Sequence, residues 1–127
     1  MTPQTRPKTI GRVELLRRLE EQPPANEDRK DGYALVNVLD PEMYAREHIP
    51  NSINIPAGKE DEFERQFEKT KRIIVYCSSS ECDASPSVAK RLIERGFNQV
   101  IHYEGGMNDW KDAHNPIAGK NQYLDNE

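Results

Sequence analysis

Residues 72–86 read RIIVYCSSSECDASP. The run at 72–77 is continuous and rich in β-branched residues, which is the composition of a buried strand. Ser85 and Pro86 combine a favoured helix N-cap with a favoured first helical residue. The apolar residues that follow recur at helical spacing up to Gly96, and they are Val88, Ala89, Leu92 and Ile93. The stretch therefore predicts a strand that ends at a thiol, then a loop, then a helix.

Further strands and helices alternate on both sides of this stretch. Short apolar runs predict strands at residues 33–39, 52–55 and 98–103. Helical spacing and start signals predict helices at residues 11–22, after Asp40-Pro41, around Phe63 and Phe67, and around Trp110. Parallel neighbours need crossover connections, so this alternation predicts an α/β domain with a mainly parallel sheet. Ligands of such sheets bind beyond the carboxyl ends of the strands, where Cys77 lies.

The composition limits the classes of protein to consider. The chain has 127 residues, enough for one domain but not for two. Its net charge is -4 and its basic residues are interspersed with acids, which argues against a nucleic-acid partner. No run approaches the roughly 20 apolar residues that span a bilayer, and the first ten residues lack the apolar core of a signal peptide. We therefore expect a soluble, cytoplasmic protein with no membrane partner.

The chain has two cysteines, Cys77 and Cys82. A small secreted domain held together by disulfides usually has four or more, so this pair indicates an intracellular protein. Two thiols are also too few for a tetrahedral zinc site, because His48, His102 and His114 are scattered along the chain. We expect neither a metal nor another cofactor.

The loop after Cys77 has features that favour an activated thiol and features that oppose it. Only the thiolate is a good nucleophile, and the start of a helix stabilises it with unpaired N–H groups. If the loop curls around Cys77, its amides would form an anion-binding nest, with the hydroxyls of serines 78–80 at the rim. Glu81 and Asp83 place carboxylates in or beside the loop that would repel an anion, and no Lys or Arg lies inside it.

Cys82 raises the expectation that Cys77 is reactive. A cysteine at the end of a buried strand is more often an inert, small hydrophobic residue. A second thiol five residues later suits a sulfur relay, in which Cys82 is a candidate resolving thiol. It would either displace the sulfur from a Cys77 persulfide or close a disulfide with Cys77. A disulfide needs the two Cα atoms within about 7 Å, and the sequence leaves that distance open.

Taken in order, these segments resemble the rhodanese homology domain over about residues 9–117. The matching stretches are ALVNV at 34–38, Tyr44, EHIPNSINIP at 47–56, IVYC at 74–77, Ser85, the helix at 88–97, Val100, and EGGM at 104–107 with Trp110. The resemblance implies a five-stranded, mainly parallel sheet flanked by helices on both faces. It implies that Cys77 is the catalytic nucleophile and cycles through a persulfide, while His48 and Trp110 are structural. The substrate-binding loop that it implies consists of Ser78, Ser79, Ser80, Glu81 and Cys82.

Two departures from the family pattern bear on the expected activity. Asn37 and Leu39 stand where family members commonly carry Asp and Arg, near the end of the first core strand. The loop is rich in serine and ends in Cys82, whereas many members have glycine and a basic or hydroxyl residue there. We therefore expect weak turnover of thiosulfate, with another donor or a protein persulfide preferred.

The function that follows is transfer of sulfane sulfur from thiosulfate or a persulfide to a thiol or protein acceptor, by a monomeric domain at 9–117. Residues 1–8 and 118–127 are expected to be flexible. A phosphatase built on Cys, five residues and Arg is set aside, because Asp83 occupies the arginine position. A catalytically weak module that binds proteins, or senses redox state through Cys77 and Cys82, remains the alternative.

Overall fold

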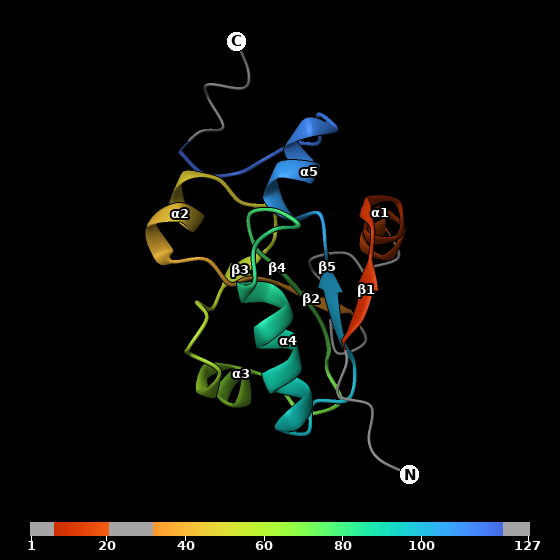
Figure 1. Cartoon of the computed structure of the whole chain (residues 1–127), viewed down its shortest axis with the longest axis vertical. Coiled ribbons are helices and arrows are strands. Elements are labelled where there is room, and N and C mark those ends of the chain that lie inside the picture. Colours follow the sequence, from red (N-terminus) through yellow and green to blue (C-terminus); the bar gives the residue numbers. More distant parts are fainter. Residues whose placement is uncertain (1–6, 21–31, 121–127) are drawn as a thin grey trace.

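The computed structural model describes residues 7–20 and 32–120. Within them the chain forms a five-stranded sheet whose neighbouring strands are all parallel, in the order β1-β5-β4-β2-β3 (Figure 1). The strands are β1 (Lys8–Ile10), β2 (Tyr33–Asn37), β3 (Ile53–Asn54), β4 (Arg72–Tyr76) and β5 (Val100–Tyr103). The predicted α/β class with a parallel sheet is confirmed.

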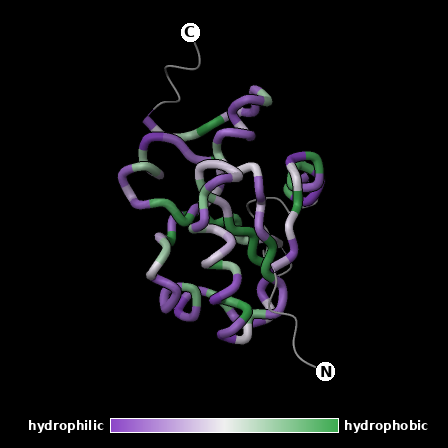
Figure 2. Tube along the Cα trace, viewed as in Figure 1, coloured by the Kyte–Doolittle hydropathy of each residue, from purple (hydrophilic) through white to green (hydrophobic). Residues whose placement is uncertain are grey.

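Helices cover both faces of this sheet, because successive strand residues point to opposite sides. One core joins Ile73 and Val75 of β4 to α3 (Asp61–Gln66) and α4 (Ala84–Glu94). The other joins Ile74 and Tyr76 to α1 (Arg12–Glu20) and α5 (Gly106–Asp112). Hydrophobic residues accordingly gather along the central strands, and the outer turns of the helices are hydrophilic (Figure 2). The remaining helix, α2 (Pro41–Arg46), starts at the predicted cap, where Asp40 accepts the Met43 N–H.

Three boundaries differ from those that the sequence predicted. Lys8, assigned to a flexible arm, begins β1 and pairs with Ile101. At the other end, Ala118 forms a bridge with His48, so the ordered chain continues beyond residue 117. Helix α4 starts earlier than expected, with Asp83 at its cap and Ser85 already inside its first turn. Most of the predicted arm and tail lies outside the described residues.

A network of buried hydroxyl groups holds Tyr76, the last residue of β4, in place. The Tyr76 hydroxyl lies 2.8 Å from Ser52 Oγ and accepts the Ile49 N–H at 3.0 Å. Ser52 is buried as well and bonds the Ile49 carbonyl. Burial raises the pKa of the Tyr76 phenol, so it stays protonated and keeps both bonds at neutral pH. The residue that follows Tyr76 is therefore held in one position.

The start of α5 clamps the first two residues of the cysteine loop. Met107 N–H donates to the Cys77 carbonyl and Asn108 N–H to the Ser78 carbonyl, each at 2.8 Å. The approach is so close that a Cβ on Gly106 would lie 2.6 Å from the Cys77 carbonyl oxygen. Gly106 also has a φ of 67°, a region that other residues occupy only at a cost. Only glycine meets both requirements at this position.

We predict that Gly106→Ala lowers the free energy of unfolding by about 3 kcal/mol, because it adds backbone overlap to left-handed strain. Gly58→Ala is the matched control, since Gly58 also has positive φ but open space around its Cβ position. That variant should lose only about 1 kcal/mol. Equilibrium unfolding in urea measures both, and equal losses would mean that the close approach at Gly106 is absent.

Candidate functional site

Cys77 lies at the carboxyl end of β4, directly after the last strand residue, Tyr76. Strand β4 pairs with β2 on one side and β5 on the other, so the thiol position is central in the sheet. The residue is 1% exposed. The sequence predicted this position correctly, because the apolar run that forms β4 stops there.

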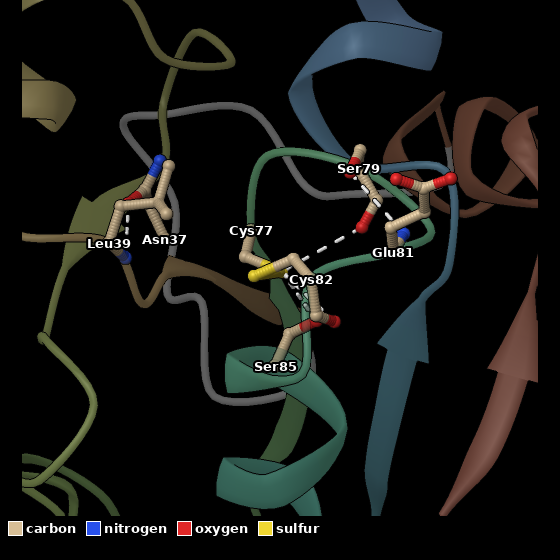
Figure 3. Close-up of a disulfide and its surroundings, with 7 residues drawn as sticks. All are labelled: Asn37, Leu39, Cys77, Ser79, Glu81, Cys82 and Ser85. Carbon is tan, nitrogen blue, oxygen red and sulfur yellow. Dashed lines mark hydrogen bonds between the residues drawn. A yellow bond between two sulfur atoms is a disulfide. The ribbon is translucent and has the colours of Figure 1, made fainter.

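Cys77 and Cys82 form a disulfide, with their Cα atoms 6.5 Å apart (Figure 3). The distance that the sequence left open is therefore short enough for a bond. The backbone brings Cys82 back to Cys77 through a tight turn, in which Cys82 N–H donates to the Ser79 carbonyl at 3.1 Å. Cys82 is half-buried, so it is the more accessible of the two cysteines.

Oxygen atoms surround the Cys77 sulfur in this disulfide-bonded state. The Ser85 hydroxyl oxygen is 3.2 Å from Sγ, the Cys82 carbonyl oxygen 3.7 Å and the Ser79 carbonyl oxygen 3.9 Å. The expected nest of amides around Sγ is not formed in this state of the described loop: the Cys82 N–H donates to the Ser79 carbonyl and the Glu81 N–H to Ser79 Oγ. The arrangement suits a neutral sulfur better than an anionic one.

Ser85 is the functional candidate that the sequence reasoning missed. The sequence indicated it as a helix start and as one of the residues that match the family, without a role in the chemistry, yet its side chain is fully buried and contacts Cys77 Sγ. Its inward direction follows from its place in the first turn of α4, two residues after the Asp83 cap, whereas the sequence placed Ser85 at the cap itself. A hydroxyl at this distance can donate a hydrogen bond to a Cys77 thiolate.

The two carboxylates of the loop region are on the outside. Glu81 and Asp83 are both exposed. In Figure 3 the Glu81 side chain is directed away from the disulfide, while its N–H donates to Ser79 Oγ at 3.3 Å. Water screens exposed charges of this kind, so they weaken the attraction of an anionic donor without blocking it.

Asn37 and Leu39 lie on the other side of Cys77 from Glu81 in this view (Figure 3). Asn37 is fully buried, and its Oδ1 accepts the Leu39 N–H at 2.9 Å. Asn54 Nδ2 reinforces the same turn by donating to the Leu39 carbonyl at 2.8 Å. These contacts give Asn37 a role in shaping the turn after β2, without placing a charge beside the sulfur.

His48 and Trp110 are held by contacts typical of structural residues. The His48 ring stacks on Tyr44 with centroids 3.8 Å apart, and its Nδ1 lies 2.7 Å from the Tyr44 carbonyl oxygen. Trp110 is buried and donates from Nε1 to the Pro116 carbonyl at 2.7 Å. These contacts agree with the structural roles that the resemblance implied.

A pocket of about 520 Å³ borders the outer side of the loop. Ser79 and Ser80 form one wall, and the starts of α1 and α5 form the others. Arg12 bonds Asp109 across it at 2.9 Å, and the Tyr103 hydroxyl donates to the same carboxylate at 2.6 Å. Cys77 does not line this pocket, so the pocket lies beside the disulfide and does not contain it.

Neither a metal site nor a membrane span is found in the part of the chain that the structure describes. No group of three or more His, Cys, Asp and Glu side chains there could hold a metal ion. No helix of the described residues has the length and apolar character needed to cross a bilayer.

Comparisons with known proteins agree on one family. The family model for the rhodanese-like domain matches residues 14–113. Thiosulfate sulfurtransferase GlpE of Coxiella burnetii is 34% identical over 94 residues, covering 74% of this chain and 85% of that protein. Thiosulfate sulfurtransferase GlpE of Pseudomonas syringae is 30% identical over 86 residues, covering 68% and 79%. The crystal structure of the BH2092 protein from Bacillus halodurans matches with a TM-score of 0.74 and 29% identity, covering 89% of this chain and 77% of that one.

We predict that Ser85→Ala slows alkylation of Cys77 near neutral pH by about tenfold, because a hydrogen bond to a charged group is lost. The measurement uses reduced protein in a Cys82→Ser background, so that iodoacetamide meets one thiol. Ser87→Ala is the control, since Ser87 is two residues further along α4 and faces another direction. Equal rates in the two variants would show that Ser85 does not support the thiolate.

Proposed function

Because the chain belongs to the rhodanese-like domain family, we propose that it is a sulfurtransferase that carries sulfane sulfur as a persulfide on Cys77. The main support is the position of Cys77, which ends the central strand and is followed by a clamped loop and the first turn of α4. Relatives that are at least 30% identical and named thiosulfate sulfurtransferases agree with this activity.

The first step loads the sulfur and requires the reduced state of the protein. The Cys77 thiolate attacks the outer sulfur of thiosulfate, a new S–S bond forms, and the old S–S bond breaks. Sulfite leaves with the electron pair of the broken bond. In this step Ser85 Oγ–H donates to the Cys77 sulfur while it is anionic. Residues 78–82 surround the incoming sulfur as the substrate-binding loop.

The second step passes the sulfur on to an acceptor. A thiolate of a small molecule or a protein attacks the terminal sulfur of the persulfide, and Cys77 leaves as a thiolate ready for the next cycle. Cyanide acts as an artificial acceptor in the same way and yields thiocyanate. The cycle needs an environment that keeps Cys77 reduced, which fits the cytoplasm.

The structure favours a modest thiosulfate activity. Thiosulfate is a dianion, and the loop offers it two exposed carboxylates, Glu81 and Asp83. Arg46 and Lys111 form ion pairs with Glu42 and Glu47, so their charges are partly offset. A persulfide donor with less negative charge would meet less repulsion. We therefore propose a persulfide of a small thiol or a protein as the better donor.

We predict that Cys77→Ser abolishes thiocyanate formation from thiosulfate and cyanide. With a persulfide donor, the reduced Cys82→Ser protein should gain about 32 Da, the mass of one sulfur, and lose it again on adding cyanide. The Cys77→Ser protein should show no such gain in intact-mass spectra. Circular dichroism confirms that each variant is folded. A gain of one sulfur by folded Cys77→Ser would exclude Cys77 as the carrier.

We also predict that the double variant Glu81→Gln/Asp83→Asn raises kcat/KM for thiosulfate by about two- to fourfold at low salt, because two repelling charges are removed. The Asp83 side chain makes no cap hydrogen bond, so helix α4 should be unaffected. Glu94→Gln is the control, since Glu94 is the last residue of α4 and lies about 16 Å along the helix from Asp83. A gain that persists in high salt, or one that Glu94→Gln shares, would refute the electrostatic explanation.

A further inference from the structure

We propose that Cys82 discharges the Cys77 persulfide within the loop, so that the domain releases hydrosulfide and closes the Cys77–Cys82 disulfide. This inference rests on the proposed function, since it needs a persulfide on Cys77. It adds a second outcome to sulfur transfer, in which the sulfur leaves as sulfide without any external acceptor.

The step balances without an outside oxidant. The Cys82 sulfur attacks Cys77 Sγ, and a bond between these two sulfurs forms while the bond from Sγ to the terminal sulfur breaks. The terminal sulfur leaves with the electron pair and takes up the proton of the Cys82 thiol, as HS⁻. The sulfane sulfur is reduced and the two cysteines are oxidised. A dithiol reductant then reopens the disulfide by thiol–disulfide exchange and resets the protein.

The backbone of the loop brings Cys82 to the inner sulfur, and not to the terminal one. In the disulfide, Cys82 is bonded to Cys77 Sγ itself, which is the atom it must attack. In this state hydrogen bonds hold the backbone of both cysteines. The Cys77 carbonyl accepts the Met107 N–H, and the Cys82 N–H donates to the Ser79 carbonyl. The geometry therefore favours disulfide closure over transfer of the sulfur to Cys82.

The electrostatics of the closed loop favour the same outcome. The Ser79 and Cys82 carbonyl oxygens lie 3.9 and 3.7 Å from Cys77 Sγ, with their negative ends toward the sulfur. Glu81 adds an exposed negative charge in the same loop. As the loop closes onto Cys77, these oxygens replace the N–H donors of the open loop, so an anionic terminal sulfur becomes disfavoured, whereas the neutral disulfide does not. Expelling HS⁻ to water removes the charge.

The two cysteines differ in solvent exposure, and this difference gives them different roles. Cys77 is 1% exposed in the disulfide, so a sulfur donor cannot reach it before reduction. Cys82 is half-buried, so an external dithiol meets Cys82 first and frees Cys77. The Cys77–Cys82 disulfide therefore forms when sulfide is released, and it prevents Cys77 from taking up sulfur again until a reductant has acted.

The test is a single turnover with the whole 127-residue chain, which is first reduced, then freed of reductant and kept without oxygen. One equivalent of thiosulfate, or in a parallel sample of glutathione persulfide, is added with no other thiol. Sulfide is trapped with monobromobimane, and the protein mass is recorded. The wild type should release about one equivalent of sulfide and become about 2 Da lighter than its reduced form. Cys82→Ser and Cys82→Ala should stay about 32 Da heavier and release at least tenfold less sulfide.

The possible results distinguish a failure of this inference from a failure of the proposed sulfurtransferase function. If the wild type keeps the extra sulfur as the Cys82 variants do, or if the extra sulfur maps to Cys82, internal discharge is wrong and sulfur transfer through Cys77 stands. If neither donor adds sulfur to the wild type or to the two folded Cys82 variants, and the wild type releases no sulfide, the proposed function fails and the inference fails with it. The Cys77→Ser protein should give neither product.

Discussion

The contact between the start of α5 and the backbone of Cys77 and Ser78 is the constraint on which the site depends. Two N–H groups of α5 hold the carbonyls of these residues, and Gly106 permits the approach because it has no Cβ. Below this contact, the Tyr76 hydroxyl ties the last strand residue to Ser52 and Ile49. The backbone that carries the thiol is therefore held by α5 on one side and by the Tyr76 network on the other. Only the loop beyond Ser78 is left to rearrange.

That division would allow one loop to serve both states of the proposed sulfur cycle. In the closed state the oxygens of Ser79, Cys82 and Ser85 contact the Cys77 sulfur, which suits a neutral disulfide. A persulfide anion requires N–H or O–H donors instead. Ser85 provides one donor in either state, because it belongs to α4 and not to the turn. In the proposed cycle, reduction frees the Cys82 N–H and neighbouring N–H groups to turn toward the sulfur, and the chemistry of the loop would then depend on its oxidation state.

The sequence predicted the elements whose pattern is strong, and missed features that depend on a few residues or on backbone contacts. The run at 72–77 and the apolar face of α4 led directly to the position of Cys77. Strand β1 was missed because it has three residues, of which only Ile10 is buried. The disulfide depended on the turn between Ser79 and Cys82, which no residue pattern in the loop encodes. Ser85 was read as a cap because Ser-Pro is a start signal, whereas the helix begins before it.

The most direct test of the account is a crystal structure of the reduced Cys82→Ser protein after treatment with a persulfide donor. The account predicts one additional sulfur on Cys77 Sγ, loop amides turned toward it, and unchanged hydrogen bonds from Met107 and Asn108 to the carbonyls of Cys77 and Ser78. An unmodified Cys77 in crystals of protein that has taken up sulfur, or sulfur bound at another residue, would contradict it.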